Sequence, residues 1–475
     1  MQYINRIDYF TSKEKEYIIM ETIANFIADF NKFLWGPPLL FMLVGVHIFL
    51  TFRLKFIQRY VPLGIKLSIK NDHNSSGMIS NFGALSIALA ATIGTGNIIG
   101  VATAIVLGGP GAVFWCWVCG IFGIATKYGE SLLSLKYREQ SSDGQFHGGP
   151  MYVIEKGMKN KWLAILFAVF TVGASFGVGN LAQSNAVSTF TYEAFGVPHW
   201  MTGIGETLFI ALAVFGGLKV ISRICSALVP VMAVFYVISC FVILFICRGM
   251  ILPAIQLIIS EAFSLRSVTG GFTGTVIMLA MRYGIARGLF SNESGLGSAP
   301  IIAAAAQTRN PVRQALISST GTFWDTVCIC AITGITIVSA MLFTYGNCGG
   351  IDFSKFQAQE LTKTAFNVLP FSGLSILTIA LAIFACTTVL GWFCYGEQAI
   401  HYLGGKKALF VYRLIFVAAV YFGAVTKLEI VWNFSDIANG LMAIPNIISL
   451  FVLHNVIAAE TKRYLHDGKI DDYAE

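Results

Sequence analysis

Long apolar runs separated by short polar segments dominate this chain of 475 residues. A helix needs about 20 apolar residues to cross a bilayer, and only helices or closed barrels satisfy the backbone in lipid. The runs are continuously apolar rather than alternating, which favours helices over barrel strands. The pattern predicts an all-α membrane protein with about eleven transmembrane helices. These are expected near residues 34–54, 82–107, 111–135, 161–192, 199–217, 222–247, 268–305, 314–343, 371–400, 409–425 and 430–456.

Two of the expected helices carry glycine-rich interruptions near their middles. The second helix is interrupted at Gly94-Thr95-Gly96-Asn97, and the seventh between Gly284 and Gly297. They lie five helices apart, so setting the first helix aside leaves two sets of five that each open with a broken helix. Because five is odd, the second set enters from the opposite side of the membrane. The sequence therefore predicts an inverted repeat with a binding site at the two interruptions.

This reading divides the chain into five segments. They are an N-terminal tail with an amphipathic stretch (1–33), an added transmembrane helix (34–56), a first five-helix repeat (78–247), a second five-helix repeat (267–456) and a C-terminal tail (457–475). Most of the 32 Lys and Arg residues fall in one set of alternate loops, among which we count Lys127. The positive-inside rule then places the N-terminus outside and the C-terminus in the cytoplasm. We expect a multi-pass protein of the plasma membrane, the inner membrane of a bacterium.

Composition excludes several other classes of protein. Only 12% of residues are charged, about half the share of a soluble domain. The net charge of +7 resides in loops, so it does not indicate nucleic-acid binding, and no obligate protein partner is evident. No metal cluster or nucleophile motif indicates an enzyme, no filter segment or charged pore ring indicates a channel, and no long soluble segment indicates a receptor. A transporter embedded in the lipid bilayer remains.

The two interruptions suit a small zwitterion. The N-terminus of a half-helix offers N–H donors and a positive dipole end to a carboxylate, and freed carbonyl groups suit an ammonium group or a bare cation. An amino acid carries one group of each kind, so two broken helices can hold both of its ends. The alternative is an ordinary packing kink in a glycine-rich helix, which the echo in the seventh helix disfavours.

Several motifs, spread from the second expected helix to the last, resemble the alanine/glycine:cation symporter family, also called sodium:alanine symporters. They are Gly94-Thr-Gly-Asn-Ile-Ile-Gly-Val-Ala-Thr-Ala-Ile105, Gly108-Gly-Pro-Gly-Ala-Val-Phe-Trp115, Gly148-Gly-Pro-Met-Tyr-Val-Ile-Glu-Lys156, Asn292-Glu-Ser-Gly-Leu-Gly-Ser-Ala-Pro300, Gly391-Trp-Phe-Cys-Tyr-Gly-Glu397 and Trp432-Asn-Phe-Ser-Asp-Ile-Ala-Asn-Gly-Leu-Met-Ala-Ile-Pro445. The resemblance implies a leucine-transporter-type core of ten helices with one helix in front. It also implies alternating access and uptake of alanine or glycine coupled to Na⁺, with H⁺ coupling as the alternative.

The resemblance also implies a substrate site. The amides near Thr95, Gly96 and Asn97 would hold the carboxylate. The ammonium group would meet the carbonyls of Phe290 and Ser291 and the side chain of Asn292. Four more residues would lie beside the bound amino acid: Phe176, Gln183, Thr388 and Trp392. For the aromatic residues, core packing is the competing interpretation.

A Na⁺ site is implied next to the first interruption. Its ligands would be the carbonyls of Ala90 and Ile93 and the hydroxyls of Thr387 and Thr388. Oxygen-only ligation suits a hard cation, although a buried Thr also commonly bonds back to its own helix. No organic cofactor is expected.

Five charged residues fall inside expected helices and should be paired, because an unpaired charge is costly there. Arg287 and Glu293 are the expected pair, as a gate or a brace across the second interruption. The others are Arg282, Asp325 and Asp436.

Overall fold

The computed structural model describes residues 22, 25–70, 75–142, 144–265, 276–346, 351–370, 372–426 and 429–474, with the backbone alone for 429–435. Most of the predicted N-terminal tail, residues 267–275 of the second predicted repeat and the side chains of Trp432–Ser435 lie outside this description, whereas the last motif is described from Asp436 onward. The described chain is mostly helical, as the apolar pattern predicts. Seven described helices are long and apolar enough to cross a membrane, or nine segments if each of two bent pairs is one span.

The first half of the chain begins with a helical segment at residues 25–34. It is followed by α2 (Pro37–Arg53), η2 (Ile57–Tyr60), α3 (Val61–Ser68), α4 (Asn81–Thr92), η3 (Gly96–Gly100), α5 (Val101–Gly108), α6 (Ala112–Lys136), β1 (Glu139–Gln140), β2 (Phe146–His147), α7 (Pro150–Gly157), α8 (Lys161–Phe176), η4 (Gly177–Leu181), α9 (Ala182–Phe195), α10 (His199–Gly216), α11 (Leu218–Ile246) and α12 (Arg248–Ala262). The two strands form an antiparallel hairpin.

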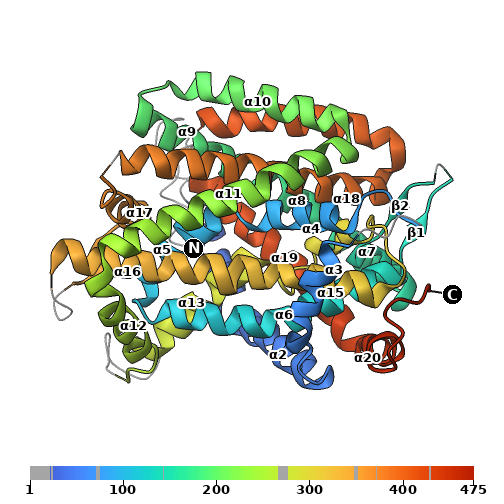
Figure 1. The fold of residues 1–475 in the computed structure, drawn as a ribbon. Coiled ribbons are helices and arrows are strands. Elements are labelled where there is room, and N and C mark those ends of the chain that lie inside the picture. Colours follow the sequence, from blue (N-terminus) through green and yellow to red (C-terminus); the bar gives the residue numbers. More distant parts are fainter. Residues whose placement is uncertain are drawn as a thin grey trace, which may run out of the picture.

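The second half contains the remaining helices. They are α13 (Val276–Asn292), α14 (Ala299–Ala303), α15 (Pro311–Thr322), η6 (Phe323–Cys330), α16 (Ala331–Tyr345), η7 (Phe353–Lys355), α17 (Ala358–Phe366), α18 (Gly373–Val425), α19 (Glu429–Val452), α20 (His454–Thr461) and η8 (Lys462–His466). The long helices lie side by side, with their axes running across Figure 1. The β1–β2 hairpin, α7, α20 and the C-terminus gather at one end of the bundle, and α12 and α17 lie at the other (Figure 1).

The first interruption is where the sequence predicts it. Helix α4 ends at Thr92, and the segment Gly96–Gly108 continues at 51° to it. Ile93 has an extended backbone (φ −78°, ψ 95°), so the helical ladder stops at this residue. The two half-helices together form one bent span.

The second interruption lies later than the sequence suggests. Helix α13 continues to Asn292, and the irregular stretch contains Glu293, Gly295 and Gly297 at φ values of 55°, 92° and 84°. Gly284, where we expected the break to begin, lies inside the helix. A Cβ atom there would come within 2.3 Å of the Ala112 carbonyl oxygen of α6. The glycine therefore permits close helix packing, and the positive φ angles define the break.

Other boundaries also differ from the prediction. The expected ninth and tenth helices are the two parts of α18, which turn at Gly405 (φ 65°, ψ −164°). The region 457–475, expected only as a tail, continues the helical chain at a bend of 59° after Val452. Lys127, which we assigned to a loop, lies in the middle of α6 with 2% of its surface exposed.

The C-terminus docks on the segment between α14 and α15. The Asn310 side-chain amide donates hydrogen bonds to the carbonyls of Ile470 and Asp472, both at 2.9 Å. Arg313 Nη1 lies 2.6 Å from Asp471 Oδ1, and the Arg313 side chain is almost fully buried. These contacts fix the C-terminus at the end of the bundle where the β1–β2 hairpin lies (Figure 1).

Two glycines allow α18 to approach the elements around the first break. A Cβ at Gly391 would come within 2.6 Å of the Ala91 Cβ on α4. A Cβ on Gly179 of η4 would come within 2.2 Å of the Trp392 Cβ. Any larger residue would push these backbones apart. This packing places α18 directly against the broken helix and sets the geometry of the candidate site.

Candidate functional site

Two carbonyl groups at the first break lack their helical donors, and one hydroxyl lies within hydrogen-bond distance of both. The Gly94 amide, which in a continuous helix would donate to the Ala90 carbonyl, donates instead to Asn97 Oδ1 at 2.9 Å. The amide of Asn97 donates to the Gly94 carbonyl, so the Ile93 carbonyl also lacks its helical donor. Thr388 Oγ1 of α18 lies 2.9 Å from the Ala90 oxygen and 3.4 Å from the Ile93 oxygen. Three of the four residues predicted to hold Na⁺ therefore come together.

The fourth predicted ligand, Thr387, does not join this cluster. Its hydroxyl donates to its own helix, at 3.0 Å to the Ile383 carbonyl and 2.9 Å to the Phe384 carbonyl. It also lies 3.4 Å from the Met232 sulfur of α11. Adjacent residues on a helix point in directions about 100° apart, so two neighbouring hydroxyls need not face one site.

The second break frees the carbonyls at the end of α13. The amides four residues beyond Phe290, Ser291 and Asn292 all donate elsewhere. Those amides are Ser294, which donates to Asn292 Oδ1, Gly295, which donates to Glu130 Oε1, and Leu296, which donates to the Glu293 carbonyl. The last turn of α13 therefore presents carbonyl oxygens without their usual helical donors.

The two breaks meet through Gly96 and the end of α13. A Cβ on Gly96 would lie 3.5 Å from the Phe290 ring and 3.7 Å from the Ser291 Cα. A cavity of about 350 Å³ adjoins this contact and is lined by Thr95, Gly96 and Phe290 together with residues of α9, α17 and α19. The first amides of a helical segment have no helical acceptor, and Thr95 and Gly96, which open the second half-helix, both line this cavity.

A buried carboxylate accepts hydrogen bonds from residues at both breaks. Asp325 of η6 is fully buried and accepts hydrogen bonds from Asn97 Nδ2 at 2.6 Å and from Ser291 Oγ at 2.9 Å. Thr326 Oγ1 donates to the same carboxylate at 2.7 Å. Asn97 and Ser291 were each predicted at the site, but their side chains point to Asp325 and neither lines the cavity.

Other residues predicted to contact the substrate are Gln183, Trp392 and Phe176, and they do not all face the first break. Gln183 Nε2 donates to the Val178 carbonyl at 3.1 Å, and its Oε1 lies 3.6 Å from the position of a Cβ on Gly94, so this side chain faces the first break. Trp392 is almost fully buried against Gly179. Phe176 lies among aromatic rings, with centroids 5.6 Å from Tyr412 and 5.5 Å from Phe416. In this structure Phe176 packs against other aromatic side chains of the core.

Asn292, another residue predicted to contact the substrate, lies at the second break. It is fully buried at the end of α13, and its Oδ1 accepts the Ser294 amide at 2.9 Å. Its Nδ2 is buried and has no hydrogen-bond partner among the described residues. An unfilled buried donor of this kind is costly, so the site holds a donor that a bound ligand can satisfy.

Comparison with known proteins shows which family the chain belongs to. The family model of the sodium:alanine symporter family matches residues 20–474. The chain belongs to this family. It is a membrane transporter and not an enzyme, and membership supports Na⁺-coupled amino-acid symport.

Relatives of this symporter match over nearly their whole length. The sodium/alanine symporter AgcS of Methanococcus maripaludis is 47% identical over 93% of this chain and 97% of its own. The "Probable sodium/glutamine symporter GlnT" of Bacillus subtilis is 36% identical over 95% of this chain and 92% of its own. The crystal structure of MhsT in complex with L-phenylalanine has the same fold, with a TM-score of 0.59 at 16% identity, and covers 82% of this chain and 93% of its own.

The symporter also has a cluster of buried charges at the second break, in which sequence reasoning identified Glu293 and Asp325 but missed Glu130 and the buried Lys127. Glu130 Oε1 of α6 accepts the Gly295 amide at 2.9 Å and Asn446 Nδ2 of α19 at 2.5 Å. The same Asn446 group donates to the Gly295 carbonyl at 2.9 Å. Glu130 and Asn446 thus hold both polar groups of one glycine in the irregular stretch.

Lys127 balances the acidic groups of this cluster. It lies one turn before Glu130 on α6, and Glu130, Glu293 and Asp325 all interact electrostatically with it. Glu293 accepts a hydrogen bond from Ser298 Oγ across the irregular stretch. The predicted Arg287–Glu293 pair is therefore wrong, because Glu293 interacts electrostatically with Lys127, and Arg287 interacts with Asp436. A Lys and a Glu three residues apart inside an apolar run were the available sequence signal.

Proposed function

We propose that this symporter takes up alanine or glycine together with Na⁺ by alternating access at the two breaks. The observation that carries the proposal is the contact of Thr388 Oγ1 with the carbonyl oxygens of Ala90 and Ile93. It brings three uncharged oxygens from two helices within reach of one point. Hard cations prefer such oxygen ligands.

Na⁺ would couple to the substrate through the shape of the first break. When Na⁺ binds, the Thr388 hydroxyl would turn its lone pair to the ion beside the two carbonyls. That contact would fix Ile93–Thr95 and order the amides that follow. Binding of one solute would then raise the affinity for the other by the same factor. The Thr387 hydroxyl would have to leave the Phe384 carbonyl to contribute.

The amino acid would lie between the breaks. The amides of Thr95 and Gly96, which open the second half-helix, would hold its carboxylate, and the Asn97 amide would have to leave the Gly94 carbonyl to join them. The freed carbonyls of Phe290 and Ser291, with Asn292, would hold its ammonium group. Gln183, Thr388 and Trp392 would bound the side chain, while Phe176 would act only through its packing. The name of the relative AgcS supports alanine, and the close contact of Gly96 with Phe290 supports a small side chain.

The proposed topology is eleven transmembrane helices with the N-terminus outside and the C-terminus in the cytoplasm. Counting α13 and the two parts of α18 separately, beside the segments that qualify by length and hydropathy, supports this number. The added helix (34–56), two inverted five-helix repeats (78–247 and 267–456) and the C-terminal segment (457–475) form the proposed units. The likeness to MhsT in fold supports this arrangement.

Proton coupling is the second candidate. It is favoured by three carboxylates, those of Glu130, Glu293 and Asp325, which are buried around one lysine. Carboxylates in such surroundings are typical of proton relays in transporters.

One uptake experiment separates the candidates. Proteoliposomes are given labelled alanine, glycine, glutamine and leucine under an inward Na⁺ gradient, an inward H⁺ gradient or neither. The proposal predicts accumulation of alanine or glycine driven by Na⁺ alone. Accumulation driven equally by H⁺ without Na⁺ would support proton coupling, and the absence of any gradient-driven uptake of the two small amino acids would reject both.

A further inference from the structure

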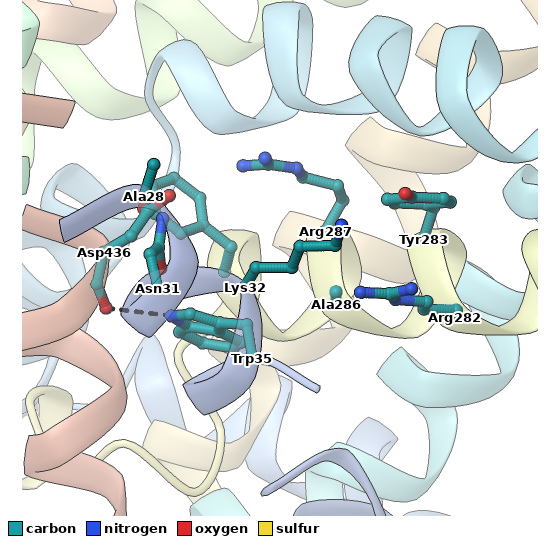
Figure 2. Close-up of a pocket in the computed structure, with 10 residues that line it drawn as sticks. Ala28, Asn31, Lys32, Trp35, Arg282, Tyr283, Ala286, Arg287 and Asp436 are labelled. Atoms are coloured by element: carbon teal, nitrogen blue, oxygen red, sulfur yellow. Dashed lines mark hydrogen bonds between the residues drawn. The ribbon is translucent and has the colours of Figure 1, made fainter. Parts of the chain in front are cut away.

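A second cavity lies between the N-terminal helical segment and α13. Its volume is about 260 Å³, and Figure 2 shows the residues that line it. Asn31, Lys32 and Trp35 come from the N-terminal segment, and Arg282 and Arg287 come from α13. Asp436 of α19 closes one side, where its carbonyl oxygen accepts the Trp35 Nε1 hydrogen bond at 2.8 Å.

The charge of this cavity is unbalanced. Lys32, Arg282 and Arg287 supply three positive charges, and Asp436 is the one acidic residue in the lining. Figure 2 shows the Lys32 side chain extending from the N-terminal segment towards α13, where the two arginines lie. Three cations around one small cavity repel each other unless an anion or water separates them.

The three cationic groups also have unused donors. Among the described residues, no hydrogen bond is seen for any of the three; Arg282 stacks near Tyr283, at 5.4 Å, and Arg287 lies near Phe290, at 5.7 Å, and interacts electrostatically with Asp436. A guanidinium group carries five N–H donors in a planar fork that matches a carboxylate. The Asp436 carboxylate accepts a hydrogen bond from the Asn31 side chain, but its Oδ1 is buried and lacks a donor among the described residues. The lining therefore offers unfilled donors for a carboxylate and an unfilled acceptor for an ammonium group.

This cavity is joined to the one at the breaks. Arg287, Phe290 and Asp436 line both cavities, and the inner one reaches Thr95 and Gly96. A ligand that leaves the outer cavity would pass Phe290 to reach the first break. The two cavities therefore adjoin one another at these three residues.

We propose that the outer cavity is a second binding site for the transported amino acid, with the carboxylate on Lys32, Arg282 and Arg287 and the ammonium group on Asp436. The proposal rests on the proposed function, because it takes the same solute. It assigns a role to the N-terminal segment, which supplies Lys32 and fixes Asp436 through Trp35. The segment would then be part of the route by which substrate enters.

The proposal is tested first by equilibrium binding. The full chain in nanodiscs, in saturating sodium gluconate, is titrated with labelled L-alanine. Two components are expected, and the weaker one should disappear in Arg282→Gln and in Lys32→Gln. Arg248→Gln, which removes a positive charge from α12 outside the cavity, should keep both components. Lys32 is exposed, so its replacement tests the site even if Arg282→Gln fails to fold.

Transport supplies the second readout. Loss of the outer site should raise the KM for alanine by about ten-fold, the lower end of what electrostatic steering supplies, and leave the maximal rate unchanged. Raising the salt concentration should reduce the difference between wild type and Lys32→Gln, since screening weakens the attraction. A wild-type KM in both variants, together with a retained second component, would overturn the proposal.

Two competitors identify the ligand. Propionate, which has a carboxylate but no ammonium group, should displace the weaker component and leave the tighter one. If chloride displaces it and propionate does not, the cations serve a halide and the assignment to the amino acid is overturned. If wild type shows no Na⁺-dependent alanine binding, the proposed function itself fails. A single Na⁺-dependent component, unchanged in Lys32→Gln, would reject only the outer site.

Discussion

The Asp325 carboxylate accepts a hydrogen bond from the Asn97 side chain at 2.6 Å, 228 residues away in the sequence. Asn97 follows the first break, and the same carboxylate accepts Ser291 Oγ at the second. One buried acid therefore fixes the relative position of the two breaks. The candidate site depends on the distance between the two breaks, because the proposed contacts to the carboxylate and to the ammonium group of the substrate come from different helices.

We expect Asp325→Asn to reduce alanine transport strongly. An Asn side chain has one acceptor oxygen, whereas Asp325 accepts from Asn97, Ser291 and Thr326. Each buried donor left unpaired costs about 1–3 kcal/mol. Labelled alanine uptake should fall by at least about ten-fold, since about 1.4 kcal/mol is a factor of ten. The control is Asp352→Asn at an exposed carboxylate, and equal uptake by the two variants would contradict the role of Asp325.

Thr388→Val is expected to weaken the dependence of transport on Na⁺. It removes the hydroxyl between the Ala90 and Ile93 carbonyls and keeps the size of the side chain. The Na⁺ concentration for half-maximal uptake should rise by about ten-fold, as expected for the loss of an interaction with a charged group. Thr378→Val is the matched control, because Thr378 is also buried on α18 and bonds to Leu374 of the same helix. A shared Na⁺ curve for both variants and wild type would place the ion elsewhere.

Gly391→Ala should impair both stability and transport. The added Cβ would come within 2.6–2.8 Å of Ala91, whose backbone cannot move aside without shifting α4. Overpacking of this kind costs about 1–3 kcal/mol. Thermal unfolding in detergent and alanine uptake should both decline. Gly205→Ala adds the same methyl group where nothing lies within 4 Å, so a comparable loss there would point to general helix effects.

Glu130→Ala should release the second break. Gly295 and Asn446 would lose their common acceptor, and Lys127 would lose an anionic neighbour. Breaking buried charged contacts costs about 3–5 kcal/mol, so a clear drop in the melting temperature is expected. Glu130→Gln keeps one acceptor oxygen and should retain part of the activity. If the alanine variant melts and transports like Glu360→Ala, an exposed acid on α17, Glu130 does not hold the break.

Sequence patterns predicted the elements of the site that depend on local chemistry. Gly94 and Gly96 mark the first break in the sequence, and a Cβ on Gly94 would come within 2.6 Å of Thr388 Oγ1. Thr388 was predicted from the family resemblance, and the structure brings it to Ala90 and Ile93. The helical content and the apolar runs follow from the need to satisfy the backbone in lipid.

Sequence patterns could not predict contacts that depend on packing. Gly284 and Gly295 look alike in a sequence, but one packs against α6 and the other adopts a positive φ. The direction of the Thr387 hydroxyl depends on its neighbours in space. Asn446 reaches Glu130 from 316 residues away, and no local pattern contains that distance.

Symport at this site requires Na⁺ and a small amino acid to bind cooperatively at the two breaks. The most direct measurement is the affinity of the purified chain for labelled alanine as Na⁺ is titrated against choline at constant ionic strength. We expect the Kd for alanine to fall steadily as the Na⁺ concentration rises, and alanine to lower the Kd for Na⁺ by the same factor. An alanine Kd that is identical in Na⁺ and in choline would contradict this expectation.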